Sequence, residues 1–383
     1  MTPRLVIITE IISPYRIPLF NTLAQHEDVD LHVIFLAETD PGLRQWLVYK
    51  EEIKFSYEVL PSWRRQIDRY KILLNRGVGP ALTRACPDVI LCGGYNYVAS
   101  WQALDWARGR GIPFFLWSES NLQDMRPGRA WIELLKHDFL RACTGFVVPG
   151  RAAREYLLTL GIGENRLYTA MNAVDNHFFS TAADSARRNA SQLRVELDLP
   201  QRYFLFVGRL VLEKGVFELL SAYATLDEGL RQQIGVVFAG DGPCRPHLEK
   251  EASSISKDRV RFVGFAQREQ LAAYYGLAEM LILPTYSDTW GLVVNEAMAC
   301  GLPVILSSAA GCGPDLVTEN WNGMIVPPKS VPPLASAMHD LASHPETSAR
   351  MGMNSTERIA QYSPQRWAQG VVRIVSAARG GRD

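Results

Sequence analysis

The chain has 383 residues, with 40 lysines and arginines, 40 aspartates and glutamates, and 47% hydrophobic residues. This length allows about two domains, each with its own core. The zero net charge argues against nucleic acid as the main partner, because nucleic-acid binders carry a clear basic excess.

The six cysteines form no CxxC pair and no cluster with histidine at zinc spacing. We therefore expect reduced thiols and no metal site. The N-terminal apolar stretch, residues 5–9, is too short for a signal peptide, and no uninterrupted apolar run is long enough to span a membrane. A cytoplasmic protein is expected, with a peripheral contact to the inner membrane face as the one alternative.

Short apolar runs alternate with helical patterns along the whole chain. The predicted strands cover residues 5–9, 31–36, 89–92, 114–117, 145–148, 203–207, 236–239, 260–263, 280–283 and 303–306. Amphipathic patterns between them cover, for example, residues 18–25, 99–108 and 217–225. Strands that are apolar on both faces and separated by helices predict parallel sheets covered on both sides. The expected fold class is α/β.

The alternation is interrupted at residues 180–192, which are polar and small and lack a hydrophobic period. It restarts at Tyr203, as a second doubly wound unit would. We predict two Rossmann-like domains with a cleft between them. Ligands of such sheets bind beyond the carboxyl ends of the strands, so the loops that follow strands are the places to search.

The loop after the first predicted strand, residues 9–16, contains no glycine. This argues against the GxGxxG fingerprint and therefore against an NAD or FAD enzyme. Ser13 followed by Pro14 is typical of a helix start with Ser13 as its N-cap, which leaves N–H groups free at the sheet edge. A helix cap without a ligand is an equal alternative.

Two cations follow the predicted strand 203–207. Arg209 comes directly after Gly208, and Lys214 opens the next helix. Arginine offers two parallel donors, lysine a mobile charge and the helix end a positive dipole, so the group predicts a pyrophosphate site. The alternative is a solvated face on which the cations pair with nearby acids, Glu213 and Glu218.

Two carboxylates follow the predicted strand 280–283. Asp288 lies at the mouth of the strand, and Glu296 follows eight positions later. A helix that begins near Gly291 puts Glu296 in its second turn and leaves room for a phosphate on the helix N–H groups. Carboxylates placed in this way suit the hydroxyls of a sugar and a ribose.

Four motifs occur in register: Gly208-Arg209-(x4)-Lys214-Gly215, Gly240-Asp241-Gly242-Pro243, Phe262-Val263-Gly264, and Asp288-(x7)-Glu296-Ala297-Met298-Ala299-Cys300-Gly301-Leu302-Pro303-Val304. Together they resemble family 4 of the retaining GT-B glycosyltransferases, the glycosyl transferases group 1. The resemblance covers residues 200–330 closely, and the first half loosely through residues 12–20 and 172–175.

The resemblance implies transfer of a sugar from a UDP- or GDP-sugar to a glycan, a lipid-linked acceptor or a small molecule. Retention of the anomeric configuration is implied, without a metal or another cofactor. The implied GT-B fold has two Rossmann-like domains facing across a cleft, an acceptor domain over residues 1–175 and a nucleotide-sugar domain over residues 176–362. A last helix, residues 363–383, would pack back on the first domain.

The resemblance also implies residue roles. Arg209 and Lys214 would hold the pyrophosphate and stabilise the charge that grows on it, and Asp288 would face the donor sugar. Glu119, after the strand 114–117, is a candidate contact to sugar or acceptor, with a rim carboxylate as the alternative. The candidate donor-binding residues are Gly208, Gly240, Gly264, Phe265, Trp290, Gly291, Leu292, Val293, Glu296 for the ribose, and Ser13.

The chain departs from the family pattern at several positions. Asp288 stands where glutamate is usual, Trp290 where phenylalanine is usual, and the first loop lacks its glycine. An active transferase is still the leading interpretation. The alternatives are a GT-B epimerase or phosphorylase, which shares the phosphate cleft, and an inactive GT-B binding subunit.

A basic stretch covers residues 61–84. It holds one acid, Asp68, and six cations, Arg64, Arg65, Arg69, Lys71, Arg76 and Arg84, interleaved with apolar residues. A basic amphipathic helix is expected, which either lies on an anionic membrane or packs as a solvated helix on the first domain. The solvated helix is favoured.

Overall fold

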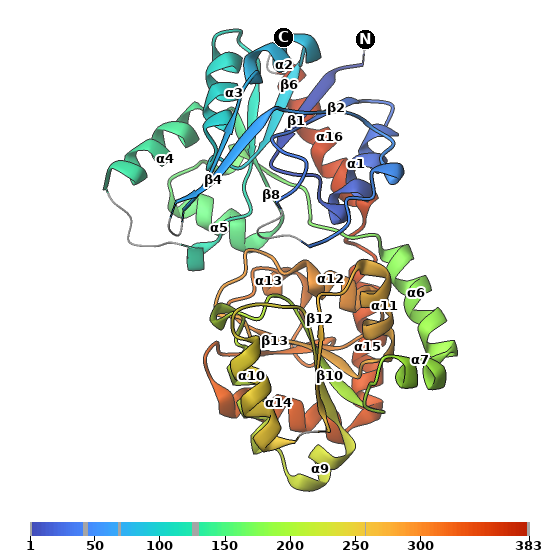
Figure 1. Ribbon diagram of the computed structural model, residues 1–383. Coiled ribbons are helices and arrows are strands. Elements are labelled where there is room, and N and C mark those ends of the chain that lie inside the picture. Colours follow the sequence, from blue (N-terminus) through green and yellow to red (C-terminus); the bar gives the residue numbers. More distant parts are fainter. Residues whose placement is uncertain (1, 41–44, 68–69, 125–129, 257, 381–383) are drawn as a thin grey trace. The chain divides into compact units, whose positions relative to one another are not determined.

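The computed structural model describes residues 2–40, 45–67, 70–124, 130–256 and 258–380 (Figure 1). It divides into two compact units. The first unit consists of Met1–Asn172 with Pro364–Asp383, and the second unit of Ala173–Ser363. The first boundary lies three residues before the predicted one and the second boundary one residue after it.

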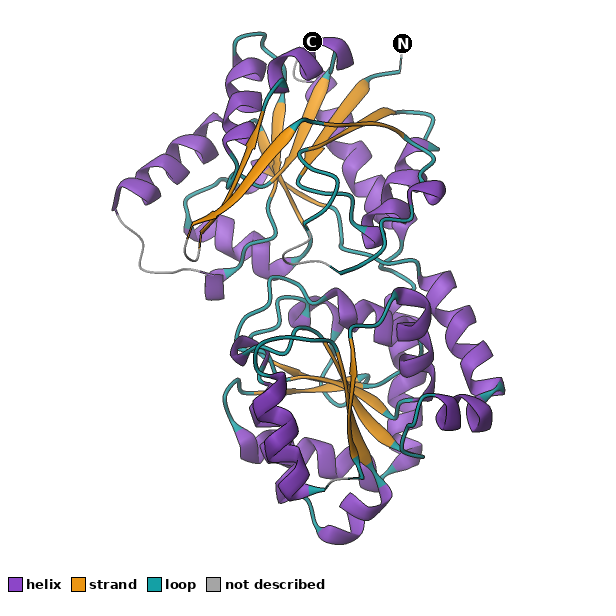
Figure 2. Ribbon diagram, in the orientation of Figure 1, coloured by secondary structure: helices purple, strands orange, loops and turns teal. Residues whose placement is uncertain are grey.

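The first unit is built on a parallel sheet with helices on both sides (Figure 2). Its described strands lie in the order β3 (Ser56–Val59), β2 (Asp30–Phe35), β1 (Arg4–Thr9), β6 (Val89–Gly93), β7 (Phe114–Trp117), β8 (Gly145–Val148), β9 (Leu167–Thr169). From β1 the chain continues to β2 on one side, and from β6 to β7 on the other. The loops after β1 and β6 therefore diverge, and the carboxyl ends of these two strands form a topological switch point.

The helices of the first unit are α1 (Ile17–Ala24), α2 (Val78–Ala85), α3 (Val98–Arg108), α4 (Ala130–Ala142), α5 (Arg151–Thr159) and α16 (Pro364–Gly380), with short 3-10 turns at Pro14–Arg16, Lys50–Glu52, Leu122–Asp124 and Glu164–Arg166. Helix α16, red in Figure 1, packs against α1. The fully buried Trp367 carries this contact, with its ring centroid 5.7 Å from Phe20 and 5.4 Å from Trp117.

The second unit has a parallel sheet in the order β12 (Val260–Gly264), β11 (Gly235–Ala239), β10 (Tyr203–Val207), β13 (Met280–Leu283), β14 (Val304–Ser307), β15 (Gly323–Val326). Its helices are α6 (Asn176–Arg188), α7 (Ala190–Glu196), α8 (Val216–Thr225), α9 (Glu228–Gln233), α10 (Arg245–Ile255), α11 (Arg268–Leu277), α12 (Leu292–Ala299), α13 (Gly313–Leu316), α14 (Val331–Ser343) and α15 (Pro345–Ile359), with a 3-10 turn at Leu212–Lys214. The switch point of this sheet lies between β10 and β13.

The predicted α/β class with parallel sheets is confirmed. Each of the ten predicted strands has a counterpart in one of the two sheets. The strands β10 and β13 are buried at every position, as expected for strands that are covered on both faces.

Residues 180–192, for which the sequence shows no hydrophobic period, lie in α6 and α7 except for the junction at Asn189. The side chain of Asp175 caps α6 by accepting from the backbone N–H of Phe178 at 3.0 Å. The buried face of α6 consists of Phe179, Ala183 and Ala186. Alanines give a weak hydrophobic signal, which explains why the helical period was not recognised.

The basic stretch is not one amphipathic helix. Strands β4 (Ser62–Ile67) and β5 (Tyr70–Asn75) form an antiparallel hairpin, and only α2 is helical. In the register of the hairpin, Trp63 lies opposite Leu74. Both side chains are exposed, by 52% and 40%, whereas the adjacent Leu73 is buried. Successive side chains therefore alternate between the two faces of the hairpin, and Asp68 and Arg69 of the basic stretch lie outside the described part of the chain.

Replacement of Trp367 tests the packing of α16. We expect Trp367→Ala to lower the free energy of unfolding of the first unit by about 3 kcal/mol or more, because a fully buried indole leaves a cavity between α1 and the sheet. Denaturant unfolding followed by circular dichroism measures the change. The control is Leu135→Ala on α4, where the side chain is 46% exposed and little effect is expected. A Trp367→Ala loss as small as that of the control would contradict the packing role.

Candidate functional site

The switch point of the second sheet holds an ion pair. Lys214, at the end of the turn that follows β10, lies with its Nζ 2.5 Å from Oδ2 of Asp288, which follows β13. Each side chain is only 17% exposed. The second Asp288 oxygen, Oδ1, accepts from the backbone N–H of Trp290 at 3.3 Å. The structure thus brings together two of the predicted catalytic residues, and the carboxylate neutralises the cation.

Backbone contacts fix the two loops that carry this pair. The carbonyl oxygen of Glu213 accepts from the backbone N–H of Tyr286 at 2.7 Å and from the hydroxyl of Thr285 at 2.9 Å. Gly215 has a φ of +67°, and a Cβ there would lie 2.1 Å from the carbonyl oxygen of Pro284. Only glycine permits this approach, so the loops are held where Lys214 and Asp288 meet.

Arg209 differs from Lys214 in being exposed. Among the residues that the structure describes, no ion pair involves Arg209, and Lys214 pairs with Asp288 and not with Glu213 or Glu218. Gly208 approaches the loop after β11 so closely that a Cβ on Gly240 would lie 1.9 Å from its carbonyl oxygen. The guanidinium therefore stands on a tightly packed loop and keeps its donors available to a ligand.

Helix α12 begins beside the ion pair. Gly291, with a φ of +95°, is its N-cap residue, and Leu292 and Val293 are its first two residues. The side chain of Trp290 is 3% exposed, and its Nε1 donates to Oδ1 of Asn295 at 2.8 Å. The indole of Trp290 therefore packs inside the unit. Of this predicted donor-binding residue, only the backbone lies at the surface of the loop.

Glu296 lies in the second turn of α12, as expected. Its Oε2 accepts from the hydroxyl of Tyr275 at 2.8 Å. Burial raises the pKa of Glu296 to about 7, although the hydrogen bond from Tyr275 opposes this shift. The carboxyl group therefore holds its proton to a higher pH than an exposed glutamate does.

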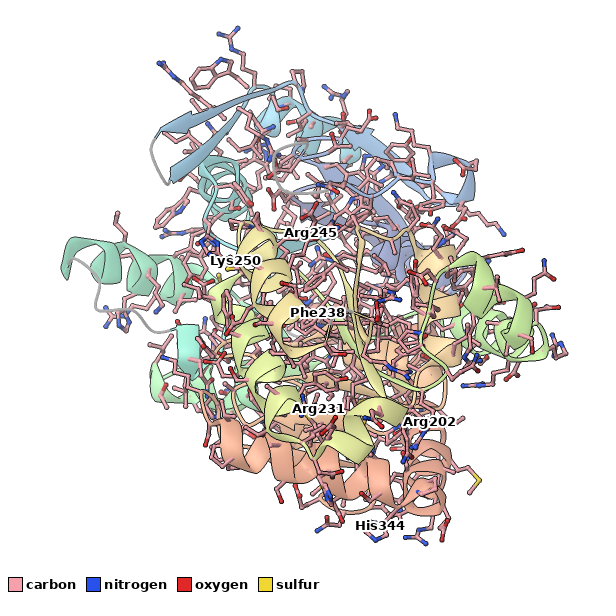
Figure 3. The ribbon with its side chains drawn as sticks, turned by 60° about the horizontal axis from the view of Figure 1, so that its bottom comes forward. Arg202, Arg231, Phe238, Arg245, Lys250 and His344 are labelled. Carbon is pink, nitrogen blue, oxygen red and sulfur yellow. The ribbon has the colours of Figure 1, made fainter. Side chains whose placement is uncertain are left out.

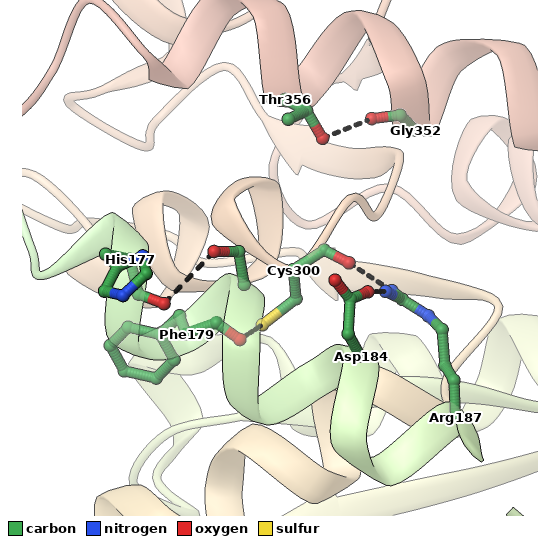
Figure 4. Close-up of polar contacts among 8 residues, drawn as sticks. His177, Phe179, Asp184, Arg187, Cys300, Gly352 and Thr356 are labelled. Carbon is green, nitrogen blue, oxygen red and sulfur yellow. Dashed lines mark hydrogen bonds and ion pairs between the residues drawn. The ribbon is translucent and has the colours of Figure 1, made fainter.

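The C-terminal end of α12 is held by α6 (Figure 4). Arg187 donates from Nη2 to the carbonyl oxygen of Cys300, and Cys300 donates from Sγ to the carbonyl oxygen of Phe179 at 3.5 Å. Arg187 is itself paired with Asp184 at 2.9 Å. A cation at a helix C-terminus stabilises the helix, so α6 helps to fix the position of Glu296.

The predicted base contacts lie at the next strand ends. Gly264 ends β12 with a φ of +74° and accepts at its carbonyl oxygen from the N–H of Gly240 at 2.7 Å, and Phe265 is 39% exposed. Sequence reasoning missed Arg245, the first residue of α10, which is labelled in Figure 3. Its Nη2 donates to the carbonyl oxygen of Phe262 at 3.3 Å, beside these two residues.

Two predicted site residues belong to the first unit. Ser13 is 4% exposed and, as predicted, is the N-cap residue of a helical segment that begins with Pro14, but this segment is a 3-10 turn and the Ser13 side chain makes no capping hydrogen bond. Oε1 of Glu119 lies 3.6 Å from Nη2 of Arg16 and accepts from Nδ2 of Asn172 at 3.3 Å. Arg16 also lies 4.4 Å from the ring centroid of Trp117.

Among the residues that the structure describes, no group of three or more His, Cys, Asp or Glu side chains is arranged to hold a metal ion. None of the helices found in the described ranges is long and apolar enough to cross a membrane.

The raised pKa of Glu296 predicts a pH-dependent stability. The native chain holds a proton on Glu296 that the unfolded chain releases between pH 4.5 and about pH 7. The free energy of unfolding should therefore fall as the pH rises through this window, and Glu296→Gln should remove this fall because glutamine does not titrate. Melting temperatures at several pH values should show a stabilisation by Glu296→Gln that is absent near pH 4.5 and largest above pH 7.

Glu251→Gln, on the exposed face of α10, is the matched control and should leave the pH dependence unchanged. A constant offset between Glu296→Gln and the wild-type chain at every pH would contradict the raised pKa.

Comparisons with known proteins agree with this geometry. Residues 189–358 match the family Glycosyl transferases group 1. Among curated relatives, the α-D-kanosaminyltransferase of Streptomyces kanamyceticus is 31% identical over 240 residues, which is 62% of this chain and 60% of the relative. A D-inositol 3-phosphate glycosyltransferase of Streptomyces bingchenggensis is 30% identical over 51% of this chain and 44% of its own length. The matched regions thus span about half of these relatives.

Solved structures are similar over nearly the whole chain. HepE of Anabaena in complex with UDP and glucose has a TM-score of 0.77 at 16% identity and covers 98% of this chain and 100% of its own. Sucrose-phosphate synthase of Thermosynechococcus elongatus has a TM-score of 0.75 at 19% identity over 99% of this chain and 100% of its own. The chain therefore has the GT-B fold, and residues 189–358 carry its match to the glycosyl transferases group 1.

Proposed function

We propose that this chain is a retaining, metal-independent glycosyltransferase that takes a sugar from a UDP- or GDP-sugar. The observation that carries the proposal is the pair of Lys214 and Asp288 at the switch point of the second sheet, with Arg209 exposed beside it. A switch point is where ligands of such sheets bind, and cations there suit a diphosphate. The match of residues 189–358 to glycosyl transferases and the UDP in the HepE complex support the same conclusion.

The proposed donor binding is an exchange of partners. The diphosphate of the donor displaces the carboxylate of Asp288 from Nζ of Lys214 and accepts a second set of hydrogen bonds from Arg209. Asp288 is thereby released toward the donor sugar, where its carboxylate accepts from a sugar hydroxyl. Aspartate is one methylene shorter than glutamate. Asp288 therefore reaches Lys214 only because the loop after β13 is hydrogen-bonded to the loop after β10.

The proposed transfer breaks the bond between the anomeric carbon and the diphosphate oxygen and forms a bond to an acceptor hydroxyl. The acceptor proton passes to the departing diphosphate. Lys214 and Arg209 stabilise the negative charge that grows on the diphosphate, an effect worth about 3 kcal/mol for each well-placed donor. These two cations take the part that a metal ion plays in other sugar transfers.

Glu296 is proposed to accept from the ribose hydroxyls, and the N–H groups at the start of α12 to bind the diphosphate. The exposed Phe265 and the backbone of Gly264 are proposed to contact the base. In the proposed role Arg245 borders the base from α10.

Two alternatives share this chemistry at the second unit. An epimerase or phosphorylase differs in what attacks the anomeric carbon, and an inactive subunit retains only binding. Incubation of the purified chain with a panel of UDP- and GDP-sugars separates the three. Release of nucleoside diphosphate supports the transferase, conversion into another sugar nucleotide supports the epimerase, and the absence of both together with no thermal shift by UDP or GDP supports the inactive subunit.

Replacement of either member of the ion pair tests the proposed exchange. We expect Lys214→Ala to lower turnover at least about 10²-fold, because the growing charge loses a donor. Asp288→Asn should instead tighten the binding of UDP or GDP, since the diphosphate no longer competes with a carboxylate for Lys214. Calorimetry measures the affinities, and nucleotide release measures turnover.

The matched control is Lys250→Ala on α10, whose side chain is exposed (Figure 3). It should leave both quantities unchanged. Equal diphosphate affinity in Asp288→Asn and wild type would rule out the exchange, and unchanged turnover in Lys214→Ala would rule out its catalytic role.

We further propose a peripheral contact of the β4–β5 hairpin with an anionic membrane. Trp63 and Leu74 lie side by side on the outer face, with the exposed Arg65 on the same strand as Trp63. Tryptophan prefers the membrane interface, and each cation near an anionic surface contributes about 1 kcal/mol. A lipid-linked acceptor would fit such a location.

Vesicle sedimentation tests this contact. At low salt, the wild-type chain should co-sediment with vesicles that contain phosphatidylglycerol and not with pure phosphatidylcholine, and Trp63→Ala should weaken binding severalfold. Leu158→Ala, on α5 with a side chain that is 40% exposed, is the control. Failure of the wild-type chain to bind the anionic vesicles would end the membrane proposal.

A further inference from the structure

The switch point of the first sheet holds a polar cluster that none of the predicted roles includes. Glu10 follows β1, and Tyr97 precedes α3 in the loop after β6. The hydroxyl of Tyr97 is hydrogen-bonded to Glu10. Burial above all, and then this hydrogen bond, raise the pKa of Tyr97 far above its ordinary value. The phenol therefore keeps its proton and donates it to the Glu10 carboxylate.

A second contact comes from the hairpin. Arg64, on β4, lies with Nη1 2.5 Å from Oδ2 of Asp40, whose side chain is only 4% exposed. Its Nη2 lies 3.9 Å from Oε1 of Glu10, which is too long for a hydrogen bond. Asp40 thus orients Arg64, and Arg64 and Tyr97 together orient Glu10. The side chain of Glu10 remains 36% exposed, so its carboxylate is the accessible member of the cluster.

The charge of the cluster restricts what it can bind. Glu10 and Asp40 carry two negative charges, Arg64 carries one positive charge and Tyr97 is neutral, so the sum is one negative charge. A phosphate or carboxylate ligand would be repelled. The Glu10 carboxylate is oriented by Tyr97 and is partly exposed to solvent, so it can accept a hydrogen bond from a ligand hydroxyl group.

We propose that Glu10 binds a hydroxyl group of a neutral, polyhydroxylated acceptor such as an unphosphorylated sugar ring. Tyr97 and Arg64 act as positioning residues that set the direction of its carboxylate. This inference rests on the proposed function, because it names the acceptor class of the same reaction. Its residues come from the switch point of the first sheet, a place where ligands of parallel sheets bind.

The test measures acceptor-class binding and nucleotide binding separately. Saturation-transfer NMR with the methyl α-glycosides of glucose, galactose and mannose should show that at least one binds the wild-type chain, and glucose 6-phosphate should bind more weakly. Glu10→Gln should raise the dissociation constant of that glycoside about tenfold or more, since a hydrogen bond to a charged group is lost. Tyr97→Phe should raise it by a smaller factor, and Glu10→Asp should partly restore binding relative to Glu10→Gln.

The control is Glu164→Gln, in the 3-10 turn that leads into β9 and therefore at the amino edge of the same sheet, which should bind the glycoside as the wild-type chain does. All variants should keep the wild-type affinity for UDP or GDP, and this readout shows that they are folded. The inference is overturned if no neutral glycoside binds the wild-type chain, if the phosphorylated sugar binds more tightly, or if Glu10→Gln binds equally well. Loss of UDP and GDP binding in the wild-type chain would refute the proposed function and would leave the glycoside measurement as a separate result.

Discussion

The divergence of the chain between β10 and β13 is the constraint on which the candidate donor site depends. Crossover connections between parallel strands are right-handed. Where the strand order reverses, the loops that follow two neighbouring strands therefore lead to opposite faces of the sheet. In the second unit this gap is filled by Lys214 and Asp288, each 17% exposed. Two charged groups that are so little exposed have lost much of their hydration. The free-energy cost of this desolvation nearly cancels the electrostatic attraction between them. In the proposed function, a diphosphate, with more charge and more acceptors than one carboxylate, displaces Asp288 from Lys214.

The sequence predicted most of the sheets because their strands are buried on both faces. Runs such as Tyr203–Val207 are large, apolar and only five residues long, which favours a buried strand over a helix segment. The edge strand Ser56–Val59 was missed because three of its four residues are exposed and it lacks an apolar face. The hairpin was mistaken for a helix because its pattern of buried and exposed side chains depends on tertiary contacts. Arg64 points inward and pairs with Asp40, whereas the apolar Trp63 points outward.

The sequence predicted which residues belong to the candidate site better than it predicted which of them contact one another. Spacing after strands located Arg209, Lys214, Asp288 and Glu296 at one edge of one sheet, because parallel strands share their carboxyl edge. The partner of Lys214 was not predictable, since it depends on the contact of Gly215 with Pro284, which brings together residues about 70 positions apart in the chain. Trp290 was predicted to bind the donor because of its place in the motif. Its indole N–H instead donates to Asn295 in the core, which the motif alone did not indicate.

The charges at the two switch points differ in a way that the zero net charge of the chain conceals. At the second sheet the loops after β10 and β13 carry the cations Arg209 and Lys214 and the acids Glu213 and Asp288, so their charges balance, but Asp288 is the acid that pairs with Lys214 and Arg209 is exposed. At the first sheet the acids Glu10 and Asp40 face one cation, Arg64, so the excess is negative. In the proposed function, an anionic donor would be repelled by the negative excess at the first sheet, whereas a neutral acceptor with many hydroxyl groups would not. In the proposed function, charge therefore favours the donor at the second unit, whereas a neutral acceptor is placed by its hydrogen bonds to Glu10 and by shape.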